Sequence, residues 1–478
     1  MDRAGSNVRF YWGVNSRSYF EQEKKSCMNK LANDPGQSVF VPESARRVGV
    51  DVRHPVGCDD RNGTDDLYRP ASQPESRFKE IHTGVSFEKR RLNLGATPDT
   101  GTPITSMDLD LTVACNLRCT YCFKEKWNEH MEEQVAFDAL VWLLYASGSA
   151  TDLTVNFMGG EPLMRFKLIE RIVPFGKRRA WQMGKKMHFG MTTNGTLVTD
   201  NVVAFWKKWG MGFHTSIDGI PEIQDRNRPM ASGRGSAWLV EKAVPKILAY
   251  RSNTAARCTV VVESAGSIVK NYRYFRSLGY TNIIFSVADA KSWTKESHAV
   301  FEQQYSELGD IVIEEFRNDR LVSVNGIDAV INGIIQNQRP QNFCGAGRGM
   351  VLVDIHGDLW PCHRWNKASE QSWRIGNIYE HFNQTVRGEL DHNCQTKLLE
   401  EDCDHCVANK FCGGGCPAEN LEETGKVYKR HPNSCESSRI YARVGQRVHD
   451  VLYKEQNPLF VKHFYKNDKA ASDTKAAQ

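Results

Sequence analysis

Long apolar runs are missing from this chain of 478 residues, and none approaches the roughly 18 residues that a membrane span requires. The opening stretch, MDRAGSNVRF, lacks the apolar core of a secretory signal. A strong charge bias is also missing, because the formal net charge is only +5, well short of a dedicated nucleic-acid-binding protein. We therefore expect a cytoplasmic protein that acts on neither membranes nor nucleic acids.

Cysteine, in contrast, is abundant. The chain has 14 cysteines, and most of them stand in groups. In a chain without a secretion signal, grouped cysteines indicate metal binding before they indicate disulfides. Four isolated ones are expected to behave as small apolar side chains: Cys27, Cys58, Cys258 and Cys394.

The pattern of apolar residues divides the chain into four predicted parts. Residues 1–105 are polar and rich in turn-forming residues beyond about Phe40, which predicts a loop-rich arm of unassigned role. Residues 106–325 alternate six times between strand and helix patterns, which predicts an α/β fold, a partial (β/α)6 TIM barrel with a parallel sheet. Residues 326–440 hold eight cysteines among short strands and turns. Residues 441–478 are expected to form an amphipathic helix that packs on the body, then a disordered tail.

Three cysteines, Cys115, Cys119 and Cys122, lie in a C-x3-C-x2-C spacing directly after the first predicted strand. A structural zinc site needs four ligands and a disulfide needs two, so neither accounts for three thiolates in one short loop. A cubane 4Fe–4S cluster has four irons, and three thiolates leave one iron open for another ligand. At this point a zinc or structural site remains the alternative.

Three more polar motifs each follow a predicted strand. GGE occupies Gly159–Glu161, TTNGT occupies Thr192–Thr196, and SIDGIPEIQDRNR occupies Ser216–Arg228. Together with the cysteine triplet, in which the aromatic Tyr121 precedes the last cysteine, these motifs resemble those of the radical S-adenosylmethionine (SAM) enzymes. The Ser216–Arg228 motif is similar to that of the members that modify peptides.

The resemblance implies a role for each motif. The GGE loop would hold the amino group of SAM, because glycine permits close backbone approach and Glu161 is a carboxylate suited to an ammonium group. Ser216 and Arg228 would bind the SAM carboxylate, and Asn194 and Asp218 would lie near the ribose. The simpler alternatives are a surface salt bridge for Arg228 and an ordinary turn at Asp218. The residues implied to contact SAM are Tyr121, Gly159, Gly160, Glu161, Asn194, Ser216, Asp218 and Arg228.

A second cysteine array occupies the C-terminal part. Its order and spacing resemble the SPASM extension of radical SAM proteins, which carries two auxiliary 4Fe–4S clusters. A zinc ribbon over 403–416 is the alternative, but it would leave the outlying cysteines unused. By resemblance, a proximal cluster would be held by Cys344, Cys362 and Cys416, and a distal cluster by Cys403, Cys406, Cys412 and Cys435.

Two positions depart from the pattern of the relatives. The stretch before Cys344, QNQRPQNF, lacks an expected cysteine, so the proximal cluster would have an open iron for a substrate thiolate, a water or a remote side chain such as Cys394. Anaerobic sulfatase-maturating enzymes carry an aspartate as catalytic base after the second proximal cysteine, whereas this chain has His363. Histidine can also move protons, and we assign it a catalytic role.

The resemblance implies a peptide- or protein-modifying enzyme with three 4Fe–4S clusters that cleaves SAM to a 5′-deoxyadenosyl radical. PCHR at Pro361–Arg364 resembles maturases that form thioether crosslinks, including the maturase of the quinohemoprotein amine dehydrogenase small subunit. We therefore expect thioether formation in a cysteine-containing peptide or small protein, with flavodoxin or ferredoxin as electron donor. The alternative is radical oxidation of a side chain, as in formylglycine formation, or of a small alcohol. A protein that kept the clusters only as a scaffold is the non-enzymatic alternative.

Overall fold

The computed structural model describes residue 92 and residues 102–465, apart from 289, 338–339, 341–343, 381–382, 384 and 391–402. The predicted arm therefore lies almost wholly outside the described residues, as do Cys27, Cys58, Cys394 and the predicted tail beyond residue 465. Among the described residues, no helix has the length and apolar character to cross a bilayer.

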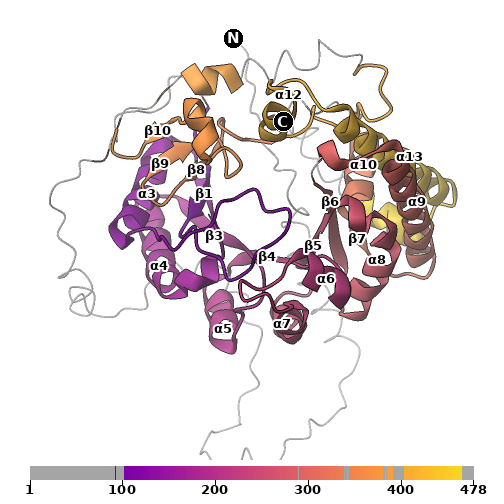
Figure 1. The fold of residues 1–478 in the computed structure, drawn as a ribbon, viewed down its shortest axis with the longest axis horizontal. Helices are drawn as coiled ribbons and strands as arrows, with labels where there is room; N and C mark the ends of the chain where they lie inside the picture. The colour runs from indigo at the N-terminus through magenta and orange to yellow at the C-terminus, as the bar shows by residue number, and fades with distance from the viewer. Residues whose placement is uncertain are drawn as a thin grey trace, which may run out of the picture. The chain divides into compact units, whose positions relative to one another are not determined.

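The described residues are built around one ten-stranded sheet, in the order β10-β9-β8-β1-β2-β3-β4-β5-β6-β7 (Figure 1). Strands β1 to β7 are all parallel to their neighbours, which confirms the predicted α/β partial barrel. The strands are β1 (Ser106–Asp110), β2 (Asp152–Met158), β3 (Lys186–Thr193), β4 (Gly212–Ser216), β5 (Ala255–Val260), β6 (Asn282–Val287), β7 (Ser323–Val324), β8 (Met350–Val353), β9 (Asp358–Trp360) and β10 (Gly376–Asn377).

Helices connect successive strands and cover the outer face of the sheet (Figure 1). The α-helices are α3 (Glu133–Ala146), α4 (Phe166–Gln182), α5 (Asp200–Trp209), α6 (Pro221–Asn227), α7 (Ala237–Tyr250), α8 (Ile268–Ser277), α9 (Lys295–Arg317), α10 (Asn325–Gln336), α12 (Pro417–Thr424), α13 (Pro432–Lys454) and α14 (Pro458–Phe464). Short 3-10 helices are η3 (Pro162–Arg165), η4 (Val262–Ser267), η5 (Ala290–Ser292) and η6 (Ala368–Trp373).

The two faces of the sheet differ in polarity. On β1, Met107 and Leu109 belong to the apolar core, whereas the side chains of Asp108 and Asp110 point to the opposite, inner face. On β5, Cys258 lies in the core, and the side chain of the preceding Arg257 points to the inner face. Because side chains alternate along a strand, one apolar face builds the core while the other presents charged groups to the interior of the barrel.

The cysteine-rich region continues the same sheet. Strand β8 pairs in parallel with β1, so that Ser106 lies opposite Met350, and β9 and β10 follow as antiparallel strands. In Figure 1 these strands lie beside β1, at the end of the sheet opposite β7. The cysteines of this region are thereby held next to the first strand of the barrel.

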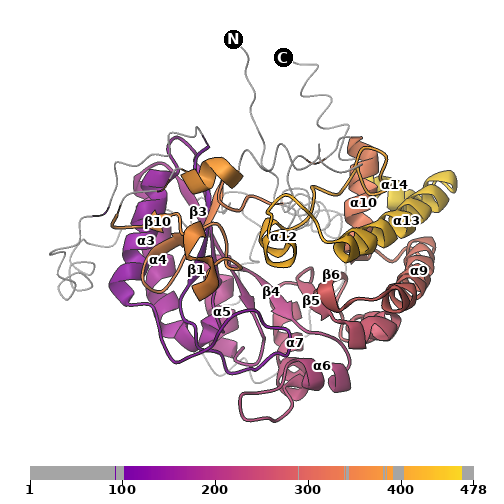
Figure 2. The same cartoon turned by 45° about the horizontal axis from the view of Figure 1, so that its top comes forward.

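The C-terminal helix α13 packs against α9 and α10, and both views show the three helices side by side (Figure 2). The face expected to pack on the body is buried, with Ile440, Val444, Val448 and Leu452 at most 2% exposed. The helix starts at Pro432, before the predicted boundary at 441, because proline is favoured at a first helical position and the His431 side chain caps the helix. Cys435 therefore lies in its first turn.

Candidate functional site

The loop that carries the first three cysteines is clamped by a distant segment, Asn227–Ala231, which we call the clamp segment. Leu117 forms an antiparallel bridge with Met230. The backbone N–H groups of Arg118 and Thr120 donate to the carbonyls of Pro229 and Asn227 at 2.8 and 2.9 Å. The cysteine loop is therefore fixed by the chain that follows α6, about a hundred residues downstream.

The three thiols are free and partly buried, and the structure contains no disulfide among the described cysteines. Burial raises the pKa of the Cys115 thiol to about 11 and also raises the pKa of Cys119, against the opposing effect of Arg228. No three His, Cys, Asp or Glu side chains in the described part converge on a single metal ion. A cubane remains compatible with this spacing, because each thiolate would bind a different iron.

Tyr121, Asp218 and Arg228 form a buried network beside this loop. The Tyr121 hydroxyl donates to Asp218 Oδ2 at 2.6 Å, and Arg228 Nε lies 2.9 Å from Asp218 Oδ1. Arg228 Nη1 is also 3.9 Å from Cys119 Sγ. Burial opposes the charge of Arg228, but Asp218, Tyr121 and Cys119 outweigh it and raise the pKa of the guanidinium well above its usual range. Arg228 is only 7% exposed, so its ion pair is not a surface salt bridge.

Asp218 is occupied by protein contacts. It is fully buried, and its Oδ1 also accepts a hydrogen bond from the backbone N–H of Thr259 at 3.0 Å. These contacts hold Tyr121 and Arg228 in place, which is more than an ordinary turn would do. The predicted role of Asp218 at a ribose stays a prediction.

The GGE loop lies directly against the strand end that precedes the cysteines. The backbone N–H groups of Gly160 and Glu161 donate to the carbonyls of Thr112 and Ala114 at 2.8 and 3.0 Å. A Cβ atom on Gly159 would stand 2.2 Å from Thr112 O, and one on Gly160 would stand 2.0 Å from Ala114 O. Only glycine permits this approach, so the short distance to the backbone explains why both positions are glycine.

The Glu161 carboxylate is 1% exposed and accepts hydrogen bonds from Leu163 N, Thr193 Oγ1 and Asn194 N at 2.7 to 3.0 Å. Burial raises its pKa to about 7, although these hydrogen bonds act in the opposite direction. Asn194 also donates from its side chain to Asn116 Oδ1 at 2.9 Å. The structure thus brings the GGE and TTNGT motifs together beside the cysteine loop, and Ser216 ends the neighbouring strand β4.

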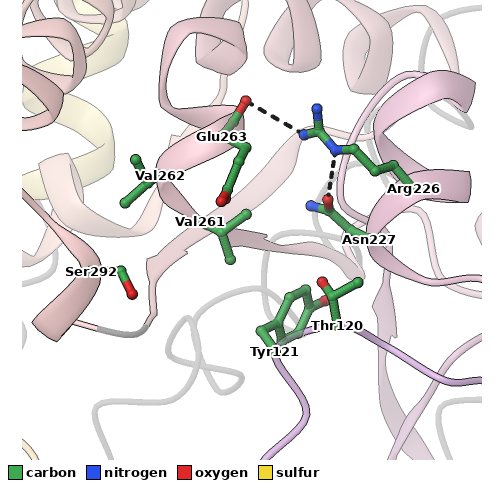
Figure 3. A pocket seen from close by; sticks show the side chains of 8 residues that line it. All are labelled: Thr120, Tyr121, Arg226, Asn227, Val261, Val262, Glu263 and Ser292. Carbon is green, nitrogen blue, oxygen red and sulfur yellow. Dashed lines mark hydrogen bonds between the residues drawn. The ribbon is translucent and has the colours of Figure 1, made fainter.

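A cavity of about 320 Å³ adjoins Tyr121 (Figure 3). Its size lies at the lower end of the range for small-molecule sites. Figure 3 shows that its walls come from the cysteine loop, the end of α6 and the segment after β5. The lining residues are Thr120, Tyr121, Arg226, Asn227, Val261, Val262, Glu263 and Ser292.

Some of the C-terminal cysteines lie near one another, and others lie beside arginines. Cys362 is buried, and burial followed by the nearby Cys416 and Cys344 raises the pKa of its thiol well above the usual range. Cys412 Sγ accepts a hydrogen bond from Arg430, and Arg439 lies close to both Cys406 and Cys435. These contacts join the three cysteines of the predicted proximal set, but only Cys406 and Cys435 of the predicted distal set share a neighbour, so both ligand sets stay predictions.

His363 faces the first strand of the barrel. Its Nδ1 lies 3.2 Å from Asp108 Oδ2, and its ring stacks on Phe123 with 5.7 Å between ring centroids. Asn156 also donates to Asp108, at 3.4 Å. Phe123 follows the last cysteine of the first loop, so His363 stands between that loop and the proximal cysteines.

Sequence reasoning missed two inner-face residues, Asp108 and Arg257. Burial and the neighbouring Arg228 lower the pKa of Arg257 to about 10. The signal for both was present, because each is a charged residue at an alternating position of an otherwise apolar strand. Arg257 thus adds a second buried positive charge beside Arg228, whose own charge is paired with Asp218.

Comparison with known proteins finds relatives of most of the described chain. The family model described as "Radical SAM superfamily" matches residues 109–288. A cysteine-type anaerobic sulfatase-maturating enzyme of Clostridium perfringens (strain 13 / Type A) is 24% identical over 341 residues, which cover 66% of this chain and 89% of that protein. A serine-type enzyme of the same description from Klebsiella aerogenes is 22% identical over 357 residues, covering 70% of this chain and 84% of that protein.

Solved structures show the same fold. The structure described as hexahistidine-tagged anSMEcpe with bound AdoMet aligns with a TM-score of 0.63 at 20% identity, covering 76% of this chain and 99% of that one. Native anSMEcpe with bound AdoMet and the Cp18Cys peptide aligns with a TM-score of 0.62 at 20% identity, covering 73% and 99%. At this identity the likeness shows the fold, including the cysteine-rich C-terminal region.

Proposed function

We propose that this chain is a radical SAM enzyme of the maturase type, and that it oxidises a cysteine or serine side chain of a peptide or small protein to an aldehyde. The observation that carries the proposal is the His363–Asp108 pair, because a histidine that contacts a carboxylate of β1 and stacks on Phe123 of the cysteine loop would suit a proton acceptor. The curated relatives are described as sulfatase-maturating enzymes of the cysteine and serine types. Their descriptions favour oxidation over the thioether chemistry expected from PCHR.

The residues around the first loop suit the cofactors that such a reaction needs. Cys115, Cys119 and Cys122 would hold a 4Fe–4S cluster, and the buried carboxylate of Glu161 would take the ammonium group of SAM. Ser216 and Arg228 would take the SAM carboxylate. When bound, the cluster and SAM supply the abstraction of a hydrogen atom from an unactivated carbon.

The cavity beside Tyr121 is placed to take the nucleobase of SAM, because it combines apolar walls with polar groups at the edge of the cysteine loop. The contacts of Asp218 with Tyr121 and Arg228 would hold this part of the site in shape before a ligand binds. Such preorganisation lowers the cost of ordering these side chains on binding.

Oxidation of a CH2–SH or CH2–OH group to the aldehyde level removes a hydrogen atom, a proton and one electron. His363 is placed to take the proton. With Nδ1–H donating to Asp108, the tautomer leaves Nε2 as the acceptor, and the stacked Phe123 fixes the plane of the ring. The C-terminal cysteines are placed to hold two auxiliary iron–sulfur clusters that accept the electron, for a total of three clusters.

A specific observation keeps thioether formation as the second candidate. The proximal group contains the three thiols Cys344, Cys362 and Cys416, and the sequence before Cys344 offers no fourth cysteine. An open iron there could hold a substrate thiolate, which metal binding keeps deprotonated. The same His363 could serve this reaction as base.

The test is the chemistry of the product. The anaerobically reconstituted enzyme is incubated with SAM, a one-electron donor of the flavodoxin or ferredoxin class, and a panel of cysteine peptides with their serine counterparts. Oxidation of a cysteine peptide gives a thioaldehyde, which water hydrolyses to the aldehyde with release of hydrogen sulfide, and the aldehyde reacts with hydrazine reagents. A product that keeps its sulfur, loses two hydrogens and resists thiol alkylation would instead establish a thioether and overturn the proposal.

A further inference from the structure

Two arginines reach the sulfur atoms of the distal cysteine group. Arg430 Nη1 donates to Cys412 Sγ at 3.1 Å. Arg439, in the first part of α13, lies close to Cys406 and Cys435. A guanidinium is drawn to an ionised sulfur much more strongly than to a neutral thiol, so these contacts suit thiolates that bind a metal cluster.

The backbone makes room for Arg430. Gly415 has a φ of +78°, and a Cβ atom at this position would stand 2.6 Å from Arg430 Nε and 2.8 Å from its Cδ. Arg430 Nε is itself buried without a hydrogen-bond partner in the described structure. The chain therefore leaves part of this guanidinium unsatisfied while directing its other end at the sulfur.

The proximal group has a different electrostatic setting. Arg364 lies near Cys416, but its guanidinium also binds Glu422 at 3.1 Å and stands 3.9 Å from Glu419. Lys367 shares Glu422, at 3.0 Å. The positive charge beside the proximal cysteines is thus already offset by carboxylates of α12, whereas Arg430 is directed at sulfur.

We propose that Arg430 and Arg439 raise the reduction potential of the distal cluster above that of the proximal cluster, and thereby make the distal cluster the preferred position of the electron taken from the substrate. Reduction adds one negative charge to a cluster, and a positive charge or an N–H···S hydrogen bond stabilises the reduced form. The inference rests on the proposed function, because it presumes the two auxiliary clusters named there.

The electron balance is simple. The substrate would give up one electron beyond the hydrogen atom and the proton, and clusters held by the two cysteine sets would pass this electron toward the distal set, in the direction of higher potential. A one-electron carrier of the flavodoxin or ferredoxin class then reoxidises the distal cluster. The difference between the two reduction potentials would set the direction of electron transfer, so no conformational change is required.

The test measures midpoint potentials in the full-length, anaerobically reconstituted enzyme by redox titration followed with electron paramagnetic resonance. Arg430→Gln should shift the midpoint of one auxiliary cluster to more negative potential and leave the SAM-binding cluster unchanged. Arg439→Gln should shift the same midpoint in the same direction but less, because its side chain is 44% exposed and its charge is screened. Arg430→Lys keeps the charge and should shift the midpoint less than Arg430→Gln.

A matched control and a change of opposite sign complete the experiment. Arg447 lies on the same helix as Arg439 but binds Asp310 and the carbonyl of Ser306, so Arg447→Gln should move no midpoint. Glu436 pairs with Arg439 at 3.2 Å, and Glu436→Gln should raise the distal midpoint, because the charge of Arg439 is then less offset. Glu436→Gln keeps both arginines, so it still tests the inference if the Arg430→Gln protein fails to assemble its clusters.

The outcomes separate the two ideas. A full complement of iron with unmoved midpoints in Arg430→Gln and Glu436→Gln overturns this inference and leaves the proposed function standing. Wild-type protein without iron at the distal cysteines contradicts the cluster assignment within the proposed function, and the inference fails with it. If Arg447→Gln shifts the midpoint potential as much as Arg430→Gln does, the shift comes from the net charge of the protein, and this inference is overturned.

Discussion

Glu161 is a carboxylate that the fold has removed from water before any ligand arrives. Its three hydrogen bonds offset only part of the cost of burying a charge, and its pKa is raised to about 7 as a result. A cation that binds beside it recovers the missing interaction. If Glu161 binds the ammonium group of SAM, as proposed, it should release a proton on binding below about pH 7.

The affinity for SAM should depend on pH because of this shift. In the free protein, Glu161 is ionised above its pKa of about 7 and protonated below it. Affinity should accordingly fall as the pH decreases through about 7, and it should fall again above about 8, where an α-amino group such as that of SAM loses its proton. Equilibrium binding of SAM across this range measures the effect.

The matched variant is Glu161→Gln. Loss of the charge-assisted contact should weaken SAM binding by about 1.5–3 kcal/mol at alkaline pH and remove the pH dependence near neutrality. Wild-type affinity that stays constant between about pH 6 and pH 8 would contradict the assignment of Glu161 to the ammonium group.

If His363 and Asp108 act on the peptide and not on SAM, substitutions at these positions should reduce the peptide product without reducing SAM cleavage. His363→Gln removes the proton acceptor, and positioned acid–base groups contribute roughly 10²- to 10⁴-fold to rates. Peptide product, followed by mass spectrometry, should fall within that range, while cleavage of SAM continues. Asp108→Asn should reduce the product less, because it disturbs only the tautomer and the orientation of the ring.

Two variants serve as controls for this prediction. His363→Asp introduces the aspartate that the resemblance leads one to expect at this position, so it should keep more activity than His363→Gln. His188 forms an exposed pair with Asp152 at 3.5 Å, and His188→Gln should have no effect. Equal losses of product and SAM cleavage in His363→Gln would point to a purely structural role.

At the scale of elements, the strands and helices of the barrel follow from local patterns, and so does the position of each motif at a strand end. What could not be predicted depends on long-range pairing. The clamp segment and the cysteine loop meet through backbone hydrogen bonds, for which side-chain patterns carry no signal. The partner of His363 was missed for the same reason, because Asp108 lies 255 residues away in the chain.

The contact between the GGE loop and the first strand end should be very sensitive to substitution. In Gly160→Ala, the added Cβ would meet the Ala114 carbonyl at 2.0 Å, so the strand end just before Cys115 must move. The variant should lose about four irons, the content of one cubane, and bind SAM weakly. Iron analysis and SAM binding measure both effects.

Gly388→Ala is the matched control. A Cβ atom at Gly388 meets nothing within 4 Å, and the residue is exposed within a helical turn. The change should leave iron content and SAM binding unchanged, because alanine is at least as favourable as glycine in a helix. If both variants keep their full iron content, the close approach at Gly160 is not needed for the cluster.

At the scale of the whole molecule, the three groups of cysteines should behave as separate cofactor sites. The reconstituted chain should hold about twelve irons if three cubanes form. Replacement of Cys115, Cys119 and Cys122 by alanine should leave about eight irons and abolish SAM cleavage. Production of 5′-deoxyadenosine by this triple variant would refute the assignment of the first loop.

The pairing of β1 with β8 has a consequence for how the protein is made. Ser106 and Met350 are partners about 240 residues apart, so at ~5–20 residues per second a ribosome needs roughly 12 to 50 seconds to supply the second strand. Until then the edge of β1 stays unpaired, next to the thiols of the first cysteine loop. The nascent chain is thus most exposed to misassociation and oxidation on the ribosome, and its yield of intact iron–sulfur protein should depend on chaperones and on oxygen during translation.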